Sequence, residues 1–375
     1  MLQQIGRSTV QTLQRTCIAD CLRGGLCAAR SQSLQISAPT RPFSPRSAQV
    51  SRVHTRAVIS ASAMTKFDQE TLVKLATQTE KALTDKTLSA ISNLSPDVVL
   101  HQDAFTLNHD IKGAEEVKKY LQAYFDKYEY EHDTLGYGVN PDSSCSFALS
   151  YDKGVHLKNK GDLPKEAVEP VATIGVWKQV YNSDGKVTDI YFYRQMSADE
   201  LHSKVKDPSK AAHAADEDLK ELVEFRGLEM KKDPWTEAKC SPERFEKLLK
   251  AAKSFSAVWQ DGKTELAKDV LAEDVVSKDL LFGNVITGFD NWSKMVHGIF
   301  ENWEQNNEMS DYAVSYCGSK AFIHWSNKGK ESKTGKENNL KGMSVLVFGH
   351  NDKAVRVLSF RQPLASERSQ VMKEE

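Results

Sequence analysis

Two segments of this chain repeat one another, and this repeat constrains the fold more than any other feature of the sequence. Four blocks of the first segment recur in the same order in the second. The paired blocks are LSPDVVLHQDAF (94–105) with LAEDVVSKDLLF (271–282), IKGAEEVKKYLQAYFDKYEY (111–130) with ITGFDNWSKMVHGIFENWEQ (286–305), FALSYDKG (147–154) with FIHWSNKG (322–329), and GKVTDIYFYRQ (185–195) with DKAVRVLSFRQ (352–362). The period is longer than that of stacked solenoid repeats, so each copy is expected to be a self-contained domain with its own core.

The first 63 residues belong to neither copy and have the composition of an organellar transit peptide. They contain eight Arg, one Asp, no Lys and no Glu, together with many Ser, Thr and Gln. Transit peptides are rich in Arg and Ser and poor in acids, so we expect residues 1–63 to be disordered and to be removed near Ala61 to Met64. The Ser-rich, Pro-containing middle favours the chloroplast, and hence the stroma. The alternative is the mitochondrion, because MLQQIGRSTVQTLQR can form an Arg-bearing amphipathic turn.

Charge and cysteine usage exclude several classes of function. The whole chain has a formal net charge of −1, and residues 1–63 carry +7, which leaves −8 for residues 64–375. An acidic body is a poor binder of nucleic acid. No apolar run reaches the roughly 18 residues that a membrane span needs. The cysteines after residue 63 show no paired spacing, so we expect neither a zinc site nor a disulfide framework.

Periodicity predicts the same order of elements in both copies. Apolar residues at helical spacing in 67–93 and 243–270 predict the helices that open each copy. A short apolar strand, a Gly-led amphipathic helix and a run of strands follow. The expected strands of this last run are 133–140, 145–151, 171–181 and 187–195 in the first copy, and 310–316, 320–326, 340–348 and 354–360 in the second.

These patterns divide the chain into domains. The first domain is expected to cover 64–198 and the second 238–364. Residues 199–237 are dense in Lys, Asp, Glu and Ala, which is typical of a charged, helical linker. Residues 365–375 are expected to form a polar tail.

The repeated unit resembles the nuclear transport factor 2-like superfamily, in particular its SnoaL-like and ketosteroid isomerase-like members. The resemblance is carried by SPDVVLHQD before a Gly-led helix and by IYFYRQ after a DGK turn, and more weakly by AEDVVSKD and VLVFGHNDKAVRVLSFRQ. It implies an α+β fold with two tandem cone-shaped domains, each a strongly curved antiparallel sheet wrapped over N-terminal helices. It also implies an apolar pocket at the wide end of each cone, and an intramolecular pseudo-dimer that forms through the sheets.

The resemblance places a catalytic acid just after the short strand in family enzymes. There the acid moves a proton next to a carbonyl from an apolar cavity that sets its pKa. In the first copy this position is Gln102, with Asp103 one residue later and on the opposite strand face. In the second copy it is Asp279, which is therefore the candidate base. The competing interpretation is an acid on a solvated face beside Lys278.

Further residues are candidates for contact with a ligand. His101 and Asp103 share a strand face and can form a pair, with Gln102 between them. His324 is a candidate catalytic partner of Asp279, and it lies beside Trp325 on one strand, so one of the two must face the interior of the domain. Trp177, Tyr193 and Trp325 are aromatic residues that can line a pocket or fill a core.

The absent motifs also bear on function. No third metal ligand recurs at fixed spacing, so no metal site is expected. There is no phosphate-cradling glycine loop and no nucleophile elbow, so no cofactor is expected.

Two classes of function remain. The first is a non-catalytic protein that binds a small apolar molecule or docks a protein partner, which the missing acid in the first copy favours. The second is an isomerase, cyclase or dehydratase acting on a small carbonyl compound, with its active site in the second domain. A scaffolding role within a larger assembly is a variant of the first class.

Overall fold

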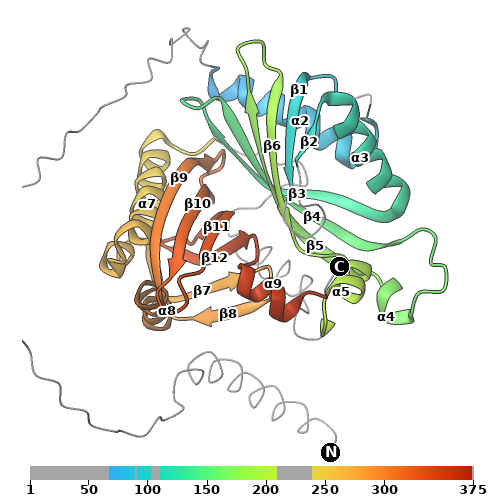
Figure 1. Cartoon of the computed structure of the whole chain (residues 1–375). Coiled ribbons are helices and arrows are strands. Elements are labelled where there is room, and N and C mark those ends of the chain that lie inside the picture. The colour runs from blue at the N-terminus through green and yellow to red at the C-terminus, as the bar shows by residue number, and fades with distance from the viewer. Residues whose placement is uncertain (1–66, 89–90, 103–109, 209–238, 374–375) are drawn as a thin grey trace, which may run out of the picture. The chain divides into compact units, whose positions relative to one another are not determined.

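The computed structural model of this chain describes residues 67–88, 91–102, 110–208 and 239–373 (Figure 1). The predicted transit peptide, most of the predicted linker and Asp103 lie outside these residues. The described residues belong to one compact unit that runs from Ala61 to Glu375. In the described part of the chain, every helix is too short or too polar to cross a membrane.

The two halves of the described chain contain the same main elements in the same order. The first half contains α2 (Gln69–Thr84), β1 (Leu94–Gln102), β2 (Ile111–Lys112), α3 (Ala114–Lys127), β3 (Tyr128–Asn140), β4 (Cys145–Leu157), α4 (Lys165–Val168), β5 (Val171–Tyr181), β6 (Val187–Arg194) and α5 (Ala198–Lys204). The second half contains α7 (Pro242–Asp261), the 3-10 helix η4 (Thr264–Ala267), β7 (Leu271–Asp279), β8 (Asn284–Thr287), α8 (Phe289–Asn302), β9 (Trp303–Ser315), β10 (Lys320–Glu331), β11 (Glu337–Phe348), β12 (Ala354–Arg361) and α9 (Ala365–Val371). The predicted α+β class is confirmed.

Local sequence explains where the helices begin. The Asp68 carboxylate accepts the N–H of Thr71 at 2.7 Å and caps α2, and the Ser241 hydroxyl caps α7 in the same way. Such oxygens satisfy N–H groups that the first helical turn leaves unpaired. Gly113 and Gly288 precede α3 and α8 with φ of 92° and 85°, a backbone conformation that glycine adopts without the strain of a side chain.

The strands form one mixed sheet. Its order is β2-β1-β6-β5-β4-β3-β9-β10-β11-β12-β7-β8. The meander from β3 to β6 and that from β9 to β12 are antiparallel, as predicted, but β1 runs parallel to β6 and β7 runs parallel to β12. A parallel neighbour requires a long connection, and here the helix and the meander supply it. The sheet, expected to be antiparallel, is therefore mixed, with one parallel pair in each half.

The two halves meet at β3 and β9. Gly138 pairs with Ser315, and Val139 pairs with Val314. This short antiparallel join makes the sheet continuous between the halves. Figure 1 shows α3 beside β1 and β2, and α7 beside β9 and β10, which agrees with the contacts of these elements.

Three large apolar clusters form the core. One lies within the first half and includes Leu72, Phe125 and Trp177. Another lies within the second half and includes Phe255 and Trp292. The third takes its residues from sheet strands of both halves and from Leu280, which follows β7. Its buried members are Leu135, Cys145, Phe147, Leu149, Tyr151, Ala172, Ile174, Val176, Tyr193, Leu280, Ala313, Phe322, Met343, Val345, Val347, Leu358 and Phe360. Apolar burial of this kind is the main favourable term in folding, so this shared cluster holds the halves together.

The segments that follow the last strand of each half are helical. Residues 198–204, which overlap the predicted linker, form α5, and residues 365–371, which were expected as a polar tail, form α9. Leu201 and Val205 pack in a small apolar cluster with Leu281, and Val205 forms a β-bridge with Met372. These contacts bring the ends of the two halves together.

Candidate functional site

Asp279, the candidate base, lies at the end of β7 in a partly buried ion pair. Its Oδ2 accepts Nε and Nη2 of Arg361 at 3.1 and 2.8 Å, and its Oδ1 accepts the N–H of Leu281 at 3.0 Å. Burial raises the pKa of the Asp279 carboxyl, and Arg361 opposes this shift. Arg361 also donates to both oxygens of Glu367, each at 2.7 Å. Asp279 therefore forms a salt bridge instead of lying free on a solvated face. Its role as a base stays a prediction.

The first half contains a matching Arg and Glu pair without the acid. Arg194 donates to both oxygens of Glu200 at 2.7 Å. Burial alone would raise the pKa of Glu200, but Arg194 and the N–H of Ser197 lower it to about 2. At the position that corresponds to Asp279, Gln102 pairs through its backbone with Phe192 of β6. The recurrent arginine therefore anchors the helix that follows the last strand of each half.

His324, the second catalytic candidate, lies in a buried polar cluster where the halves meet. Its Nδ1 is 3.5 Å from Nζ of Lys178, and its ring centroid is 4.5 Å from that of Tyr191. Burial and the Lys178 ammonium lower the pKa of His324 to about 3, so the imidazole is neutral near pH 7. Lys178 in turn forms a salt bridge with Asp311 at 3.0 Å, and both side chains are less than a tenth exposed.

Asp311 connects this cluster to the loop between β3 and β4. Its Oδ1 accepts Asn140 Nδ2 at 3.0 Å and the Ser143 hydroxyl at 2.7 Å, and Cys145 Sγ lies 3.4 Å from Oδ2. Burial would raise the pKa of Asp311, but Lys178, Ser143 and Cys145 hold it below its usual value. We name the set Lys178, Asp311 and His324, with Tyr191, the seam cluster.

His101 continues the seam cluster toward solvent. Its ring stacks on Tyr191 with centroids 4.3 Å apart. Its Nε2 lies 3.1 Å from Asp189 Oδ1, and its Nδ1 lies 3.1 Å from Asp110 Oδ1. Tyr193 lies on the same side, with its ring centroid 6.3 Å from that of His324. The structure therefore brings together three of the residues named from the sequence.

Sequence reasoning missed Lys178 and Asp311. The available signal was Lys178 inside the apolar run VATIGVWKQVY. A lysine in a buried strand needs a partner of opposite charge, because burial of an unpaired charge is costly. Its partner lies 133 positions further along the chain, and no local pattern connects the two. The tryptophans named from the sequence lie elsewhere. Trp177 stacks on Phe192 within the first core, and Trp325 packs against the second core while its Nε1 donates to Ser344 Oγ at 3.1 Å.

A second buried ionic cluster lies inside the first half. Nδ1 of His132 on β3 is 2.6 Å from Asp152 Oδ1, and its Nε2 is 3.0 Å from Glu80 Oε2. Burial would lower the pKa of His132, but Asp152 and Glu80 raise it to about 10, so the ring is an imidazolium near pH 7. The corresponding strand pair in the second half is Asn307 and Asn327, which are neutral amides.

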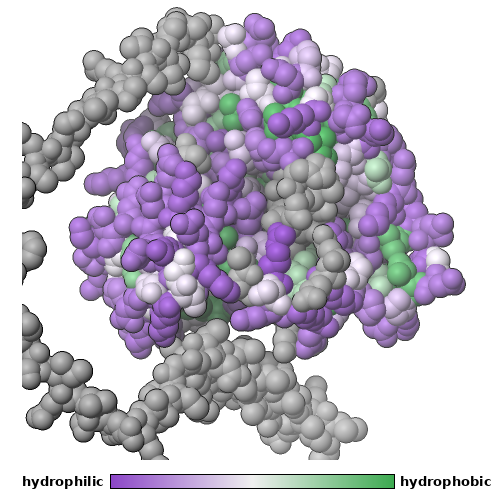
Figure 2. All heavy atoms as spheres, in the orientation of Figure 1, coloured by the Kyte–Doolittle hydropathy of each residue, from purple (hydrophilic) through white to green (hydrophobic). Residues whose placement is uncertain are grey.

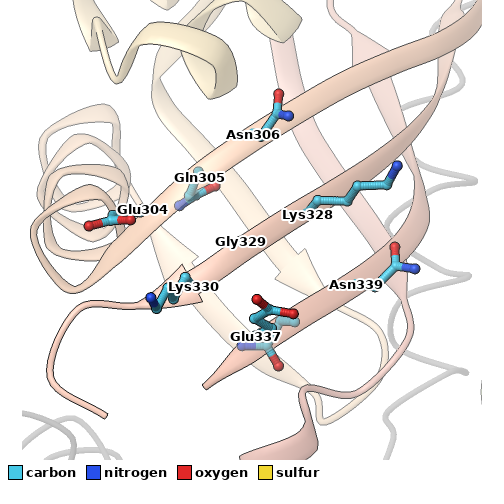
Figure 3. Close-up of a pocket in the computed structure, with 9 residues that line it drawn as sticks. Glu304, Gln305, Asn306, Lys328, Gly329, Lys330, Glu337 and Asn339 are labelled. Atoms are coloured by element: carbon cyan, nitrogen blue, oxygen red, sulfur yellow. The ribbon is translucent and has the colours of Figure 1, made fainter. Parts of the chain in front are cut away.

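The second half presents a groove of about 580 Å³ over β9, β10 and β11 (Figure 3). Direct strand partners form two rows of side chains across it. The first row is Asn306, Lys328 and Asn339, and the second is Glu304, Lys330 and Glu337. Among the residues that the structure describes, none of these six side chains forms a hydrogen bond or an ion pair with another.

The groove is polar and charged. The row around Lys328 carries one positive charge, and the row around Lys330 carries one net negative charge. Figure 3 shows Asn306, Lys328 and Asn339 aligned across the three strands. Within the described residues, no group of His, Cys, Asp or Glu is arranged to hold a metal ion. The groove can therefore accept a polar partner through uncommitted amides, ammonium groups and carboxylates.

Comparison with known proteins yields structural matches only. No protein-family model and no curated protein matches this chain. A nuclear transport factor 2-like protein of unknown function from Exiguobacterium is 19% identical, with a TM-score of 0.26, over 31% of this chain and 98% of that one.

Two further solved structures are similar over about one third of the chain. A protein proposed to be a SnoaL-like polyketide cyclase, from Mesorhizobium loti, is 17% identical, with a TM-score of 0.27, over 30% of this chain and 97% of that one. A protein with a ketosteroid isomerase-like fold from Catenulispora acidiphila, in complex with trimethylamine, is 12% identical, with a TM-score of 0.29, over 35% and 95%. These are proteins of the kind that the sequence resembles. At these TM-scores they say nothing about activity, which depends on the side chains of this chain.

Proposed function

We propose that this chain is a non-catalytic binding protein that docks a protein partner in the groove over β9, β10 and β11. The observation that carries the proposal is the contrast between two sets of polar residues. Asp279 and His324 are the candidates for proton transfer. Asp279 is partly buried and paired with Arg361, and His324 is buried beside Lys178. The six side chains of the two groove rows form no hydrogen bond or ion pair with the residues that the structure describes.

A polar partner suits the groove better than a small apolar molecule does. Its lining is made of amides, ammonium groups and carboxylates, which are costly to desolvate against an apolar ligand. Figure 2 shows a largely hydrophilic surface on the face in view. The large apolar side chains exposed in the described residues, Leu163, Leu266 and Val285, lie in separate segments. A protein segment with polar side chains supplies partners for the groove rows.

A second candidate function is an isomerase, cyclase or dehydratase that acts on a small carbonyl compound in the second half. The observation that favours it is the raised pKa of Asp279, because a buried carboxyl with a raised pKa is suited to proton transfer. In this mechanism Arg361 must release Asp279 when the substrate binds. Replacement of Asp279 by Asn would abolish such an activity and leave docking intact.

The setting of this function is also part of the proposal. We propose that residues 1–63 direct the chain to the chloroplast stroma, with the mitochondrion as the alternative, and that the two halves are tandem copies forming an intramolecular pseudo-dimer. The Arg-rich, acid-poor composition supports the first point. The repeated blocks and the apolar cluster shared by the strands of both halves support the second.

Site-specific crosslinking tests the docking proposal. A photoreactive benzoylphenylalanine at Asn306 of the 64–375 chain should capture a protein partner from an extract of the source organelle. The matched control carries the same group at Glu131, which pairs with Lys153 in the first half as Asn306 pairs with Lys328 in the second. Capture at 306 should be lost in a Lys328→Glu variant and should be absent at 131.

Two outcomes contradict the proposal. Equal capture at both positions, or capture that survives Lys328→Glu, would show that the groove is not the docking site. Native mass spectrometry of the same purified chain provides the other arm. Release of a small apolar molecule on denaturation, without capture at 306, would favour ligand binding over docking.

A further inference from the structure

Two partly exposed cysteines of the second half, Cys240 and Cys317, lie on chain segments that contact each other. Cys240 immediately precedes the capping residue of α7, and Cys317 lies in the turn between β9 and β10. The Cys240 N–H donates to the carbonyl of Tyr316 at 3.0 Å. A Cβ atom placed on Gly318 would lie 2.7 Å from Cys240 Cβ and 3.1 Å from its Sγ. Cys240 therefore contacts the residues on both sides of Cys317.

The surroundings allow both sulfurs to react. Cys240 and Cys317 are partly exposed, whereas Cys145, the other cysteine in the described residues, is fully buried. Nε of Arg244 donates to the carbonyl of Gly318 at 3.0 Å, which holds a guanidinium beside the turn. Burial and the neighbouring Cys317 raise the pKa of the Cys240 thiol, and Arg244 opposes this shift. The thiolate is the form of cysteine that attacks a disulfide. The Cys317 Sγ also lies 3.0 Å from the Ser319 hydroxyl.

We propose that Cys240 and Cys317 form a reversible disulfide by exchange with a small-molecule or protein disulfide. One cysteine thiolate attacks the oxidant, forming a mixed disulfide and releasing one oxidant thiolate. The second cysteine thiolate then attacks the protein sulfur of the mixed disulfide, forming the bond between Cys240 and Cys317 and releasing the other oxidant thiolate. The two cysteines lose two protons and two electrons, and the oxidant disulfide is reduced to two thiols.

The disulfide would connect the segment before α7 to the turn between β9 and β10 of the same half. It closes the loop 240–317, which contains α7, η4, β7, β8, α8 and β9. Closing a long loop restricts the unfolded chain far more than the folded one. In the reduced form, the described contacts at this point are the hydrogen bonds of Cys240 with Tyr316 and of Arg244 with Gly318.

Oxidation of the 64–375 chain by glutathione disulfide tests the proposal. The wild-type chain should lose about 2 Da in intact mass, and peptide mapping should join Cys240 to Cys317. The Cys240→Ser and Cys317→Ser variants should each retain one bound glutathione, because no second thiol resolves the mixed disulfide. A Cys145→Ala variant should behave as the wild type. Oxidation should raise the urea midpoint of the wild type by about 1 to 2 M, and that of neither serine variant.

Two results would overturn the proposal. One is a wild-type chain that keeps bound glutathione on Cys240 or Cys317, since this shows that the second sulfur cannot reach the first. The other is full alkylation of both cysteines after oxidation, with no loss of mass. Both measurements use the folded wild-type chain, so they hold even where a serine variant fails to fold.

Discussion

Replacement of Asp311 by Ala should destabilise the protein strongly, because it leaves the Lys178 ammonium buried without its counterion. The two side chains are 6% and 9% exposed, and their charged atoms lie 3.0 Å apart. Asn140 and Ser143 would lose their acceptor as well. Removing one member of a buried pair costs about 3 to 5 kcal/mol, most of it from the charge left behind. The variant should therefore unfold at about 1 to 2 M less urea than the wild type.

Paired variants separate the cost of an orphaned charge from the value of the ion pair. The double replacement Lys178→Met with Asp311→Leu removes both charges, so it should recover most of the lost stability. The control is Lys81→Ala, which breaks the Lys81 to Asp85 pair on α2, where the side chains are 67% and 43% exposed. That change should alter the free energy of unfolding by less than about 0.5 kcal/mol.

Urea unfolding followed by tryptophan fluorescence and by circular dichroism measures all four proteins. The reasoning is refuted if Asp311→Ala costs less than about 1 kcal/mol, the range of an exposed pair. It is also refuted if the double variant is no more stable than Asp311→Ala, because an orphaned charge would then not be the cause of the loss.

Three further predictions concern the other ionic clusters. The His132→Asn variant, which introduces the residue found at the matching second-half position, removes an imidazolium whose folded pKa is about 10. Because that pKa is raised from its ordinary value of about 6.5, the stability it confers is fully present below pH 6.5 and is lost as pH rises toward 10. The difference in melting temperature between wild type and variant should therefore shrink over that range, and a constant difference would contradict the assigned charge. The Glu200→Gln variant should cost about 3 to 5 kcal/mol at pH 7. Since the pKa of Glu200 is lowered to about 2, the wild-type advantage should hold above about pH 4.3 and fade as pH falls toward 2, as acid unfolding curves can test. The Asp279→Asn variant should lose about 1 to 3 kcal/mol of stability through its contact with Arg361 while retaining capture at residue 306, and loss of capture would connect Asp279 to docking.

Much of the fold was predictable because it depends on local periodicity. The spacing of apolar residues gave the order of helices and strands in both halves, and Gly113 and Gly288 marked the starts of α3 and α8. The strand starts were less accurate. β3 begins at Tyr128 and β9 at Trp303, several residues before the expected 133 and 310, because each strand continues directly from the preceding helix. Apolar residues that continue from a helix into a strand blur the change of period.

The parallel pairing and the seam cluster could not be predicted, because both depend on contacts between distant residues. Nothing near β1 shows that its neighbour is β6. His101, Tyr193 and His324 were recognisable as chemically able residues, but their gathering around Tyr191 depends on how the strands of the two halves face one another. Asp279 was placed correctly at the end of its strand, and its engagement with Arg361 depends on the parallel pairing of β7 with β12.

The salt bridge between Lys178 and Asp311 also makes the two halves chemically different at their interface. By strand register, Lys178 corresponds to Val345 in the second half, and Asp311 corresponds to Gly136 in the first. Two identical subunits related by a twofold axis would carry every contact twice. Here a single polypeptide carries the lysine in the first half and the aspartate in the second, so the salt bridge forms only once. A single chain can therefore carry a substitution on one side of such an interface only, whereas a homodimer would carry it on both sides.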